Sequence, residues 1–238
     1  MVGIVVKELI KVYGMGDFEV IALRGLDASF GTGKVTWVRG PSGCGKTTLL
    51  NLVGGLDRPT AGSIEVDGKN IVRLPEIDLV AYRLARVGFV FQFFNLVPVL
   101  TAWENVELPM RFAGLSAKDR EKRVTELLEA VGLKEKGDRM PDQMSGGEQQ
   151  RVAVAVALAN EPQIVLADEP TGELDSENAT VVLDLLKAAS RDRGKTVLLV
   201  SHDPHASQIA DATVKMADGR IVGADELPRG NSTAIEKA

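Results

Sequence analysis

Runs of apolar residues at strand and helix spacing predict the elements of the first third of the chain. Residues 2–12 are rich in β-branched side chains, and residues 20–30 form a second extended stretch closed by glycines, so both are predicted strands. The short apolar run 35–39 leads into a glycine loop, and residues 46–54 then carry leucine and valine at helical spacing. A strand, a glycine loop and a helix are therefore expected in that order.

The middle of the chain is predicted to be mostly helical after two further strands. Residues 63–66 lead into a tight turn, and residues 87–91 form an apolar run typical of a buried strand. Ser116 followed by Asp119 is typical of a helix start, and Gly132 is placed to end that helix.

The last third is predicted to alternate strands with a helix. Residues 164–167 and 196–200 are unbroken apolar runs on either side of the amphipathic segment 176–190, which is the pattern of parallel strands joined by a crossover helix. Residues 214–222 contain an Asp-Gly pair and predict a closing hairpin. The residues that follow have little apolar content, so we expect 226–238 to form a flexible tail.

Composition and charge narrow the class of protein. The 238 residues are 45% hydrophobic, which is enough for a compact core and argues against disorder. The formal charge of -5 disfavours binding to nucleic acid or anionic lipid through a general basic field. The longest uncharged stretch, 87–103, is shorter than the roughly 20 apolar residues that a membrane span needs. No secretory signal is recognised, and a single cysteine, Cys44, fits a reducing cytosolic location.

A phosphate-binding loop is predicted between the apolar run 35–39 and the helix after it. The pattern G-x-x-x-x-G-K-[ST] is met by Gly40, Pro41, Ser42, Gly43, Cys44, Gly45, Lys46 and Thr47. Glycines let backbone N–H groups turn inward around a phosphate, and the helix adds its positive end. Lys46 is placed to reach the β and γ oxygens and Thr47 to ligate Mg²⁺, whereas a plain glycine turn is the alternative. Nucleotide binding is the first function that the sequence predicts.

Two acids, Asp168 and Glu169, follow directly after the apolar run 164–167. In an open α/β sheet this edge carries the ligand, so Asp168 is a candidate to hold Mg²⁺ and Glu169 to polarise the water that attacks the γ-phosphate. Two acids after a strand are more often ordinary loop charges, and the phosphate loop is what favours the catalytic interpretation.

A second anion site is predicted where Ser145, Gly146 and Gly147 open a helix, because a hydroxyl and glycine amides are exposed there. A capped helix without a ligand is the alternative. Two such sites in one chain resemble the ATP-binding cassette (ABC) ATPase family, in which the serine-glycine-glycine signature of one subunit closes over the nucleotide held by the phosphate loop of another.

The resemblance covers about residues 5–223 and implies roles for further residues. Tyr13 matches the aromatic residue that stacks on adenine, with a packing role as the alternative, and Gln92 matches the glutamine that senses Mg²⁺ and the attacking water. Asp175 matches the loop that crosses the dimer interface, and His202 the histidine that contacts the γ-phosphate, whereas His205 matches nothing and is expected at the surface. The resemblance thus implies catalytic roles for Lys46, Gln92, Glu169 and His202, Mg²⁺ ligation by Thr47, Gln92 and Asp168, and nucleotide contacts from Tyr13, residues 40–47, Thr48, Ser145, Gly146, Gly147 and Asp175.

The resemblance also implies the fold. It is an α/β P-loop NTPase of the ABC ATPase type, with a mostly parallel core sheet, an N-terminal antiparallel β-subdomain and a helical signature subdomain. We expect one domain over residues 1–225, with the helical subdomain at about residues 96–160. Three residues depart from the common pattern: Cys44 and Glu148 replace serine and glutamine, and Val156 replaces a frequent arginine of the signature helix.

Residues 88–106 resemble the branch of lipoprotein-releasing and macrolide-exporting ATPases, and residues 55–62 and 168–175 agree with it. This branch implies a separate membrane permease that docks near Gln92–Leu100. The apolar side chains there fit neither helical nor alternating spacing, so they predict a groove for a permease helix, with core packing as the alternative: Phe93, Phe94, Leu96, Val97 and Val99.

The function implied is ATP hydrolysis by a transporter subunit on the inner face of the cell membrane. ATP and Mg²⁺ are the expected ligands, and the expected assembly is a head-to-tail homodimer, or a heterodimer with a related ATPase. The first alternative is a non-transport ABC ATPase that transmits force to a cell-division or cell-envelope complex. A second alternative acts on ribosomes or DNA, but one cassette without coiled-coil heptads or a basic stripe disfavours it, and no nucleic-acid partner is expected.

Overall fold

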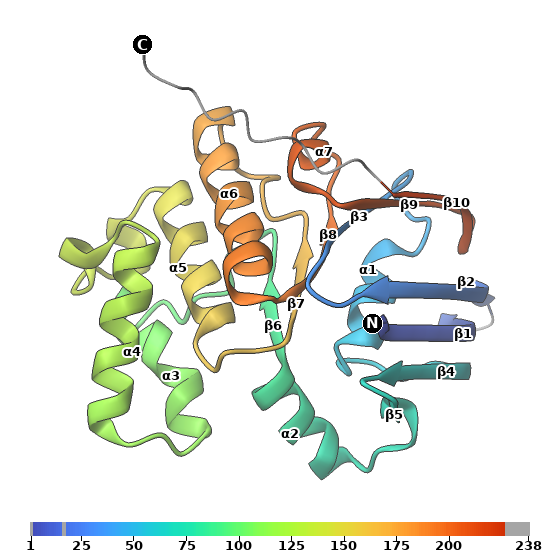
Figure 1. The fold of residues 1–238 in the computed structure, drawn as a ribbon, viewed down its shortest axis with the longest axis horizontal. Helices are drawn as coiled ribbons and strands as arrows, with labels where there is room; N and C mark the ends of the chain where they lie inside the picture. The colour runs from blue at the N-terminus through green and yellow to red at the C-terminus, as the bar shows by residue number, and fades with distance from the viewer. Residues whose placement is uncertain (1, 16–17, 227–238) are drawn as a thin grey trace.

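The computed structural model describes residues 2–15 and 18–226 (Figure 1). Its strands are β1 (Val2–Met15), β2 (Phe18–Gly31), β3 (Val35–Arg39), β4 (Ala61–Val66), β5 (Lys69–Asn70), β6 (Val87–Val90), β7 (Ile164–Asp168), β8 (Thr196–Val200), β9 (Ala212–Ala217) and β10 (Arg220–Glu226). Its α-helices are α1 (Lys46–Val53), α2 (Glu76–Arg86), α3 (Ala102–Phe112), α4 (Ala117–Ala130), α5 (Gly146–Leu158), α6 (Ser176–Arg193) and α7 (Ala206–Ile209). Short 3-10 helices span Ile71–Arg73, Lys134–Lys136 and Pro141–Gln143.

The first sheet is antiparallel, with the strand order β2-β1-β4-β5. Strands β1 and β2 pair along most of their length, from Ile4 opposite Phe30 to Tyr13 opposite Val20. In β2, Leu23, Leu26 and Phe30 are buried, whereas Phe18, Val20 and Ile21 near the hairpin tip are exposed, so only the part of the strand after Ile21 packs on the core. The two predicted N-terminal strands are confirmed, and both extend further toward the hairpin tip.

The second sheet is mostly parallel, with the order β10-β9-β3-β8-β7-β6. All pairs are parallel except that of β10 with β9, which forms the predicted closing hairpin. Every residue of β8 is buried, as expected for a parallel strand covered by helices on both faces. Helix α6 is the crossover that joins β7 to β8, as predicted.

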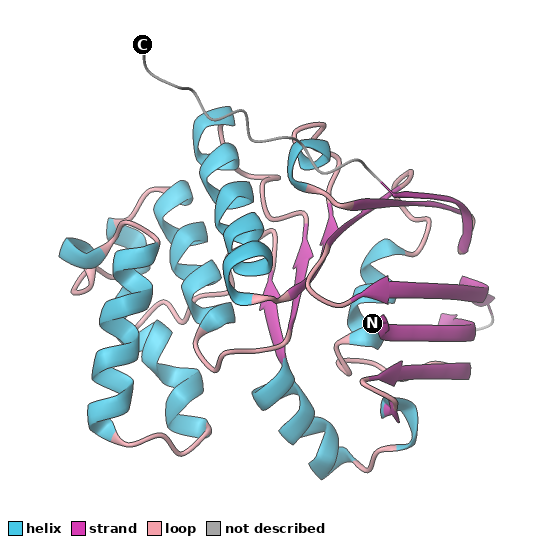
Figure 2. Cartoon of the chain, viewed as in Figure 1, coloured by secondary structure: helices cyan, strands magenta, loops and turns pink. Residues whose placement is uncertain are grey.

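Two hydrophobic cores lie on opposite faces of this core sheet. Alternate residues of β8 show the division: Val197 and Leu199 belong to the core shared with α3, α4, α5 and α6, and Leu198 and Val200 to the core shared with α1 and the antiparallel sheet. Figures 1 and 2 show α5 and α6 on one side of the core sheet and α1 on the other. The predicted fold class is therefore confirmed.

The helix boundaries show where the pattern was informative. Ser116 caps α4 by accepting a hydrogen bond from the Asp119 N–H, as predicted. Helix α6 continues past the predicted residue 190 to Arg193, where the left-handed Gly194 ends it. The sequence did not predict α2 and α3 individually. The first residue of the predicted tail belongs to β10, and residues 227–238 lie outside the described part of the chain.

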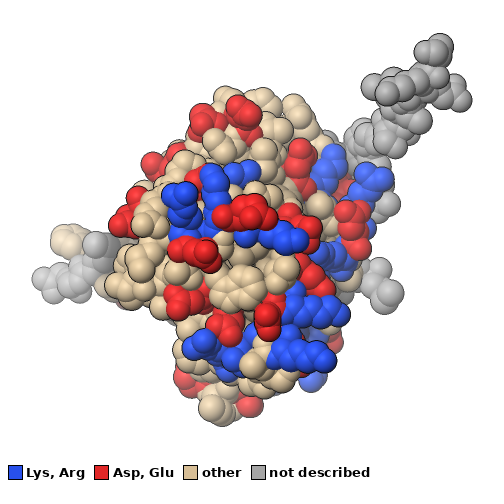
Figure 3. All heavy atoms as spheres, turned by 90° about the vertical axis from the view of Figure 1, so that its left-hand side faces the viewer, with Lys and Arg blue, Asp and Glu red and all other residues tan. Residues whose placement is uncertain are grey.

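The surface over the helical side of the molecule carries charges of both signs. Figure 3 shows basic and acidic side chains interspersed over this face, with apolar and neutral surface between them. Among residues 2–15 and 18–226, no helix combines the length and hydropathy needed to cross a bilayer.

Candidate functional site

The phosphate loop joins β3 to α1 at the carboxyl edge of the core sheet. Gly45 occupies the N-cap position of α1 with a φ of 101°, and a β-carbon there would lie 2.6 Å from the Ala22 carbonyl oxygen, so only glycine fits. No side chain caps α1 at this position, so no capping side chain occupies the first backbone N–H groups of the helix, which face the phosphate loop. The geometry is that of an anion cradle at a helix N-terminus.

Lys46 is folded back over this loop. Its Nζ donates to the carbonyl oxygens of Gly40 at 2.9 Å and Pro41 at 3.1 Å, and the side chain is nearly buried. The same Nζ lies 3.4 Å from Nε2 of His202. The structure therefore brings the loop lysine and the predicted γ-phosphate histidine together from residues far apart in the sequence.

Asp168, at the end of β7, lies beside the first residues of α1. Burial raises the pKa of its carboxyl group, while a hydrogen bond from the Thr47 side chain acts against that rise. Its Oδ1 atom is buried and has no hydrogen-bond partner among the described residues. A buried carboxylate oxygen left over in this way is suited to accept a cation or an ordered water.

Glu169 is held in an uncommon backbone conformation, with a φ of 47°. Its N–H donates to the Val200 carbonyl at 2.9 Å, and its Oε2 accepts from the His202 N–H at 3.0 Å. Its Oε1 lies 3.3 Å from Nε2 of His202. The backbone strain and these bonds fix the Glu169 carboxylate at the end of the sheet beside Lys46 and His202.

Gln92 follows β6 by two residues and is half-buried. Its Nε2 donates to Oε1 of Glu173 at 3.0 Å, and a β-carbon at Gly172 would contact the same side chain at 3.2 Å. Phe94 and Asn95 of the same loop both have positive φ. The structure thus places Gln92 beside the loop that follows Glu169, with its amide engaged by Glu173 rather than by Asp168 or Thr47.

Tyr13 lies on β1 near the first turn of α1. Its hydroxyl donates to Asp57 Oδ2 at 2.9 Å and hydrogen-bonds Thr48, and burial raises the pKa of this hydroxyl. Lys11 Nζ lies 4.7 Å from the ring centroid and 2.7 Å from Asp57. The ring is partly exposed close to the phosphate loop, and its role toward adenine stays a prediction.

The signature residues form the N-terminal end of α5. Ser145 accepts the Glu148 N–H at 3.3 Å, and its own N–H donates to Glu148 Oε2 at 2.9 Å, which completes a capping box. Lys136 pairs with the Glu148 carboxylate and lowers its pKa.

Gly147, the last glycine of the signature, packs against the start of α6. A β-carbon at Gly147 would lie 2.2 Å from Oδ1 of Asn178. Asn178 in turn donates from Nδ2 and N to Asp175, which caps α6. The signature and the Asp175 loop therefore lie side by side.

The structure divides the predicted site residues into two groups. Lys46, Thr47, Asp168, Glu169 and His202 meet at the carboxyl edge of the core sheet around the start of α1. The signature residues and Asp175 meet at the starts of α5 and α6, on the other face of the sheet (Figure 1). The sequence did not identify several partners that hold these groups in place: Lys11, Asp57, Lys136 and Glu173. Two more are Trp37, whose Nε1 donates to the Ser201 carbonyl next to His202, and Gln150, which donates to the Phe91 and Pro170 carbonyls. Gln150 had a signal, because a polar residue four positions before Val154 falls on the buried face of the helix.

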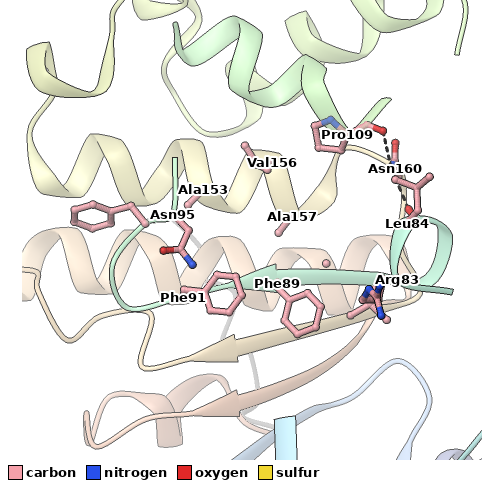
Figure 4. A pocket seen from close by; sticks show the side chains of 13 residues that line it. Arg83, Leu84, Phe89, Phe91, Asn95, Pro109, Ala153, Val156, Ala157 and Asn160 are labelled. Atoms are coloured by element: carbon pink, nitrogen blue, oxygen red, sulfur yellow. Dashed lines mark hydrogen bonds between the residues drawn. The ribbon is translucent and has the colours of Figure 1, made fainter. Parts of the chain in front are cut away.

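A pocket of about 230 Å³ lies between β6 and the helices α3 and α5. Figure 4 shows Phe89 and Phe91 on one side and Ala153, Val156 and Ala157 of α5 on the facing side. The two phenylalanine rings stack with centroids 5.5 Å apart. Asn160 closes one end by donating to the carbonyls of Leu84 and Pro109. Val156, one of the three residues that depart from the pattern of the resemblance, thus lines a pocket.

The apolar segment after Gln92 is divided between surface and core. The side chains of Phe93 and Val99 are 69% and 74% exposed, whereas Leu96 packs against the core shared with α3, α4, α5 and α6. Phe94 and Asn95 line the pocket of Figure 4. His205 is exposed, as expected, and bonds Asp203.

The chain is similar to known proteins over most of its length. The family described as ABC transporter matches residues 23–172. The lipoprotein-releasing system ATP-binding protein LolD of Bacteroides fragilis is 46% identical over 200 residues, which cover 84% of this chain and 93% of the relative. The macrolide export ATP-binding/permease protein MacB of Marinobacter nauticus is 41% identical over 216 residues, or 91% of this chain and 33% of the relative.

A solved structure agrees over almost the whole chain. The ATP-binding cassette MJ0796 of Methanocaldococcus jannaschii, determined as a dimer in a post-hydrolysis state bound to ADP and Pi, superposes with a TM-score of 0.88. The two proteins are 40% identical in this comparison, which covers 94% of this chain and 99% of that chain.

Proposed function

Because the chain belongs to the ABC transporter ATP-binding proteins and is an ABC ATPase, we propose that it hydrolyses ATP at two composite sites of a head-to-tail dimer and drives a separate membrane permease. One observation carries the composite-site part. The phosphate loop and the Ser145 signature are both helix N-termini, but they belong to opposite faces of the core sheet. Two chains related head to tail would bring each signature over the other's nucleotide, as the dimeric state of MJ0796 supports.

The nucleotide would lie with its phosphates in the loop 40–47 and its adenine toward Tyr13. Lys46 now donates to two loop carbonyls, and these donors would turn to the β and γ oxygens when the phosphates enter. Ser145, Gly146 and Gly147 of the second chain would donate to the γ-phosphate from the other side, with Asp175 at the interface.

The residues at Asp168 fit Mg²⁺. Thr47 offers a hydroxyl, and Asp168 offers a buried oxygen without a hydrogen-bond partner in the described chain. Mg²⁺ in nucleotide sites takes few protein ligands and fills the rest of its shell with phosphate oxygens and waters. Gln92 would join this set after its amide leaves Glu173. Bound Mg²⁺ would neutralise charge on the phosphate oxygens.

Glu169 is the group we assign to the attacking water. Its carboxylate can accept a proton from that water as the water oxygen bonds to the γ-phosphorus and the bond to the ADP oxygen breaks. His202 holds the carboxylate through its N–H and stands between it and Lys46, so its ring faces the position of the γ-phosphate.

We assign the membrane partner to the surface around Gln92–Leu100 and the pocket beside it. Phe93 and Val99 present exposed apolar surface there, and the pocket between β6 and α5 is lined mainly by apolar side chains. This shape suits an amphipathic helix of the permease. The likeness to LolD and MacB supports a lipoprotein-release or macrolide-efflux type of system and a position on the inner face of the cell membrane.

The composite sites are tested by oligomer size in the Glu169→Gln chain. We expect it to be dimeric with saturating Mg-ATP and monomeric without nucleotide, because ATP that is not hydrolysed keeps the faces together. Glu121→Gln, an equal change on the exposed surface of α4, serves as the control and should hydrolyse ATP like the parent. A Glu169→Gln chain that stays monomeric with Mg-ATP contradicts the composite sites.

The permease assignment is tested with two exposed phenylalanines. Phe93→Asp should abolish co-purification with a multi-spanning membrane protein, whereas Phe18→Asp, on the distant hairpin and 77% exposed, should leave it intact. If both variants retain the partner equally, the assigned surface is wrong. A partner without membrane spans that belongs to the cell-division machinery would favour the non-transport alternative.

A further inference from the structure

Gln150 is a polar residue that the protein buries completely. It lies on α5, one and a half turns beyond Ser145, and its exposed fraction is 0%. Its Nε2 donates to the Phe91 carbonyl at 3.0 Å and to the Pro170 carbonyl at 2.7 Å. One side-chain amide of the signature helix therefore holds two backbone segments that are distant from it in sequence.

Both acceptors are next to residues of the assigned catalytic machinery. Phe91 immediately precedes Gln92, and Pro170 immediately follows Glu169. Both loops also contain left-handed residues, which are Glu169 in one and Phe94 and Asn95 in the other. Such conformations persist only where the surroundings hold them, and the Gln150 amide is one of the groups that does so.

The residue type matches this double contact. A single NH₂ group carries two donors, so it can serve two carbonyls at once, which neither a hydroxyl nor a carboxylate can do. The Oε1 atom of the same amide is buried without a hydrogen-bond partner among the described residues. An apolar side chain of similar length would avoid that unfavourable burial but would leave the Phe91 and Pro170 carbonyls without this donor.

We propose that Gln150 is a positioning residue: from the signature helix α5 it holds the Gln92 loop and the Glu169 loop in place relative to each other. The proposal rests on the proposed function, since it takes Gln92 and Glu169 as the groups that act on Mg-ATP and water. Helix α5 begins at the signature and is rigid over this distance. A shift of α5 as Ser145 meets the partner's nucleotide would therefore reach both loops through one side chain.

Three variants of the full chain separate positioning from stability. Gln150→Met keeps the length of the side chain but has no donor, and Gln150→Asn keeps the amide on a shorter stem. Ser190→Ala is the matched control, because its buried hydroxyl also donates to a backbone carbonyl, that of Gly33, on another part of the sheet. Each variant is measured for melting temperature, kcat and KM for Mg-ATP, and hydrogen–deuterium exchange of residues 88–96 and 168–175 without nucleotide.

Positioning predicts opposite rankings for stability and rate. Gln150→Met should melt above Gln150→Asn, because it fills the space with apolar atoms, yet it should have the lower kcat. We expect its kcat to fall about 10- to 100-fold, the size that a misplaced catalytic group can produce, with little change in KM. Exchange should rise in both loops of Gln150→Met together, and Ser190→Ala should leave kcat and both loops at parent values.

The proposal is overturned if exchange in either loop of a folded Gln150 variant equals that of the parent, or if kcat follows the same order as the melting temperatures. A parent chain that does not hydrolyse Mg-ATP would contradict the proposed function instead. In that case the exchange of the two loops still decides whether Gln150 positions them.

Discussion

Ser145 has two possible tasks, to cap α5 and to bind a phosphate, and a pair of alanine variants separates them. Ser145 Oγ accepts the Glu148 N–H at 3.3 Å, and Ser116 Oγ accepts the Asp119 N–H at 3.2 Å at the start of α4. The two serines make nearly the same capping bond. Ser116→Ala is therefore the matched control for Ser145→Ala.

The structure sets the size of the expected effects. Loss of a serine cap costs about 1 kcal/mol, which lowers the melting temperature of a domain of this size by roughly 2–4 °C. Both variants should lose this amount. Only Ser145→Ala should also lose a hydrogen bond to an anionic phosphate at each of the two composite sites. Each bond is worth about 1.5–3 kcal/mol, so ATP-dependent dimerisation should weaken on the order of 100- to 10,000-fold.

Two assays decide between these tasks. Calorimetry without nucleotide measures the cap, and sedimentation with Mg-ATP in the Glu169→Gln background measures the phosphate contact. The phosphate role of Ser145 is refuted if both variants lose equal stability and dimerise equally. If Ser145→Ala melts like the parent, the capping bond seen here contributes nothing to stability.

Two further predictions concern the same end of α5. The hydrogen bond from Lys136 lowers the pKa of the Glu148 carboxyl group in the folded chain. A carboxyl group of this kind stabilises the folded chain at pH values above its pKa in the unfolded chain. That stabilisation is lost as the pH falls through the pKa of the folded chain. Lys136→Met should therefore lower the melting temperature at neutral pH and converge with the parent in acid; a constant difference across pH would contradict this pairing. Gly147→Ala places a β-carbon 2.2 Å from Asn178 Oδ1 and should lower the free energy of unfolding in urea by about 1–3 kcal/mol. Gly14→Ala, which has open space around the new carbon, should lower it less. Equal losses in the two variants would refute the clash.

The elements that the sequence predicted best are those whose environment is encoded locally. The strands 35–39 and 196–200 were predicted with their observed bounds, because a strand covered on both faces is an unbroken apolar run. Helix α4 was recognised from its cap at Ser116 for a similar reason, since the cap bonds only its own first turn.

The helices α2 and α3 also carry local signals, but each has a feature that argues against them. Helix α3 starts with a capping box between Thr101 and Glu104. In α2, Ile77, Val80 and Leu84 recur at helical spacing. However, Ile77 and Val80 are exposed and Leu79 and Tyr82 are buried, so this apolar stripe does not mark the buried face. Helix α3 contains Pro109, a residue that argues against a helix interior. For the segment after Gln92, the sequence did not decide between a surface groove and core packing. In the structure Phe93 is exposed and Leu96 packs against the core.

A glycine loop and a serine cap act through backbone groups within a few residues of themselves. The sequence therefore predicts two candidate phosphate sites and their positions along the chain. It is the fold that places the two helix N-termini on opposite faces of one sheet, brings Lys46, Glu169 and His202 together, and lets Gln150 reach both Phe91 and Pro170. The physical reason is that hydrophobic periodicity tells each element which side to bury, but not which distant element will cover it. That choice depends on packing across the whole domain.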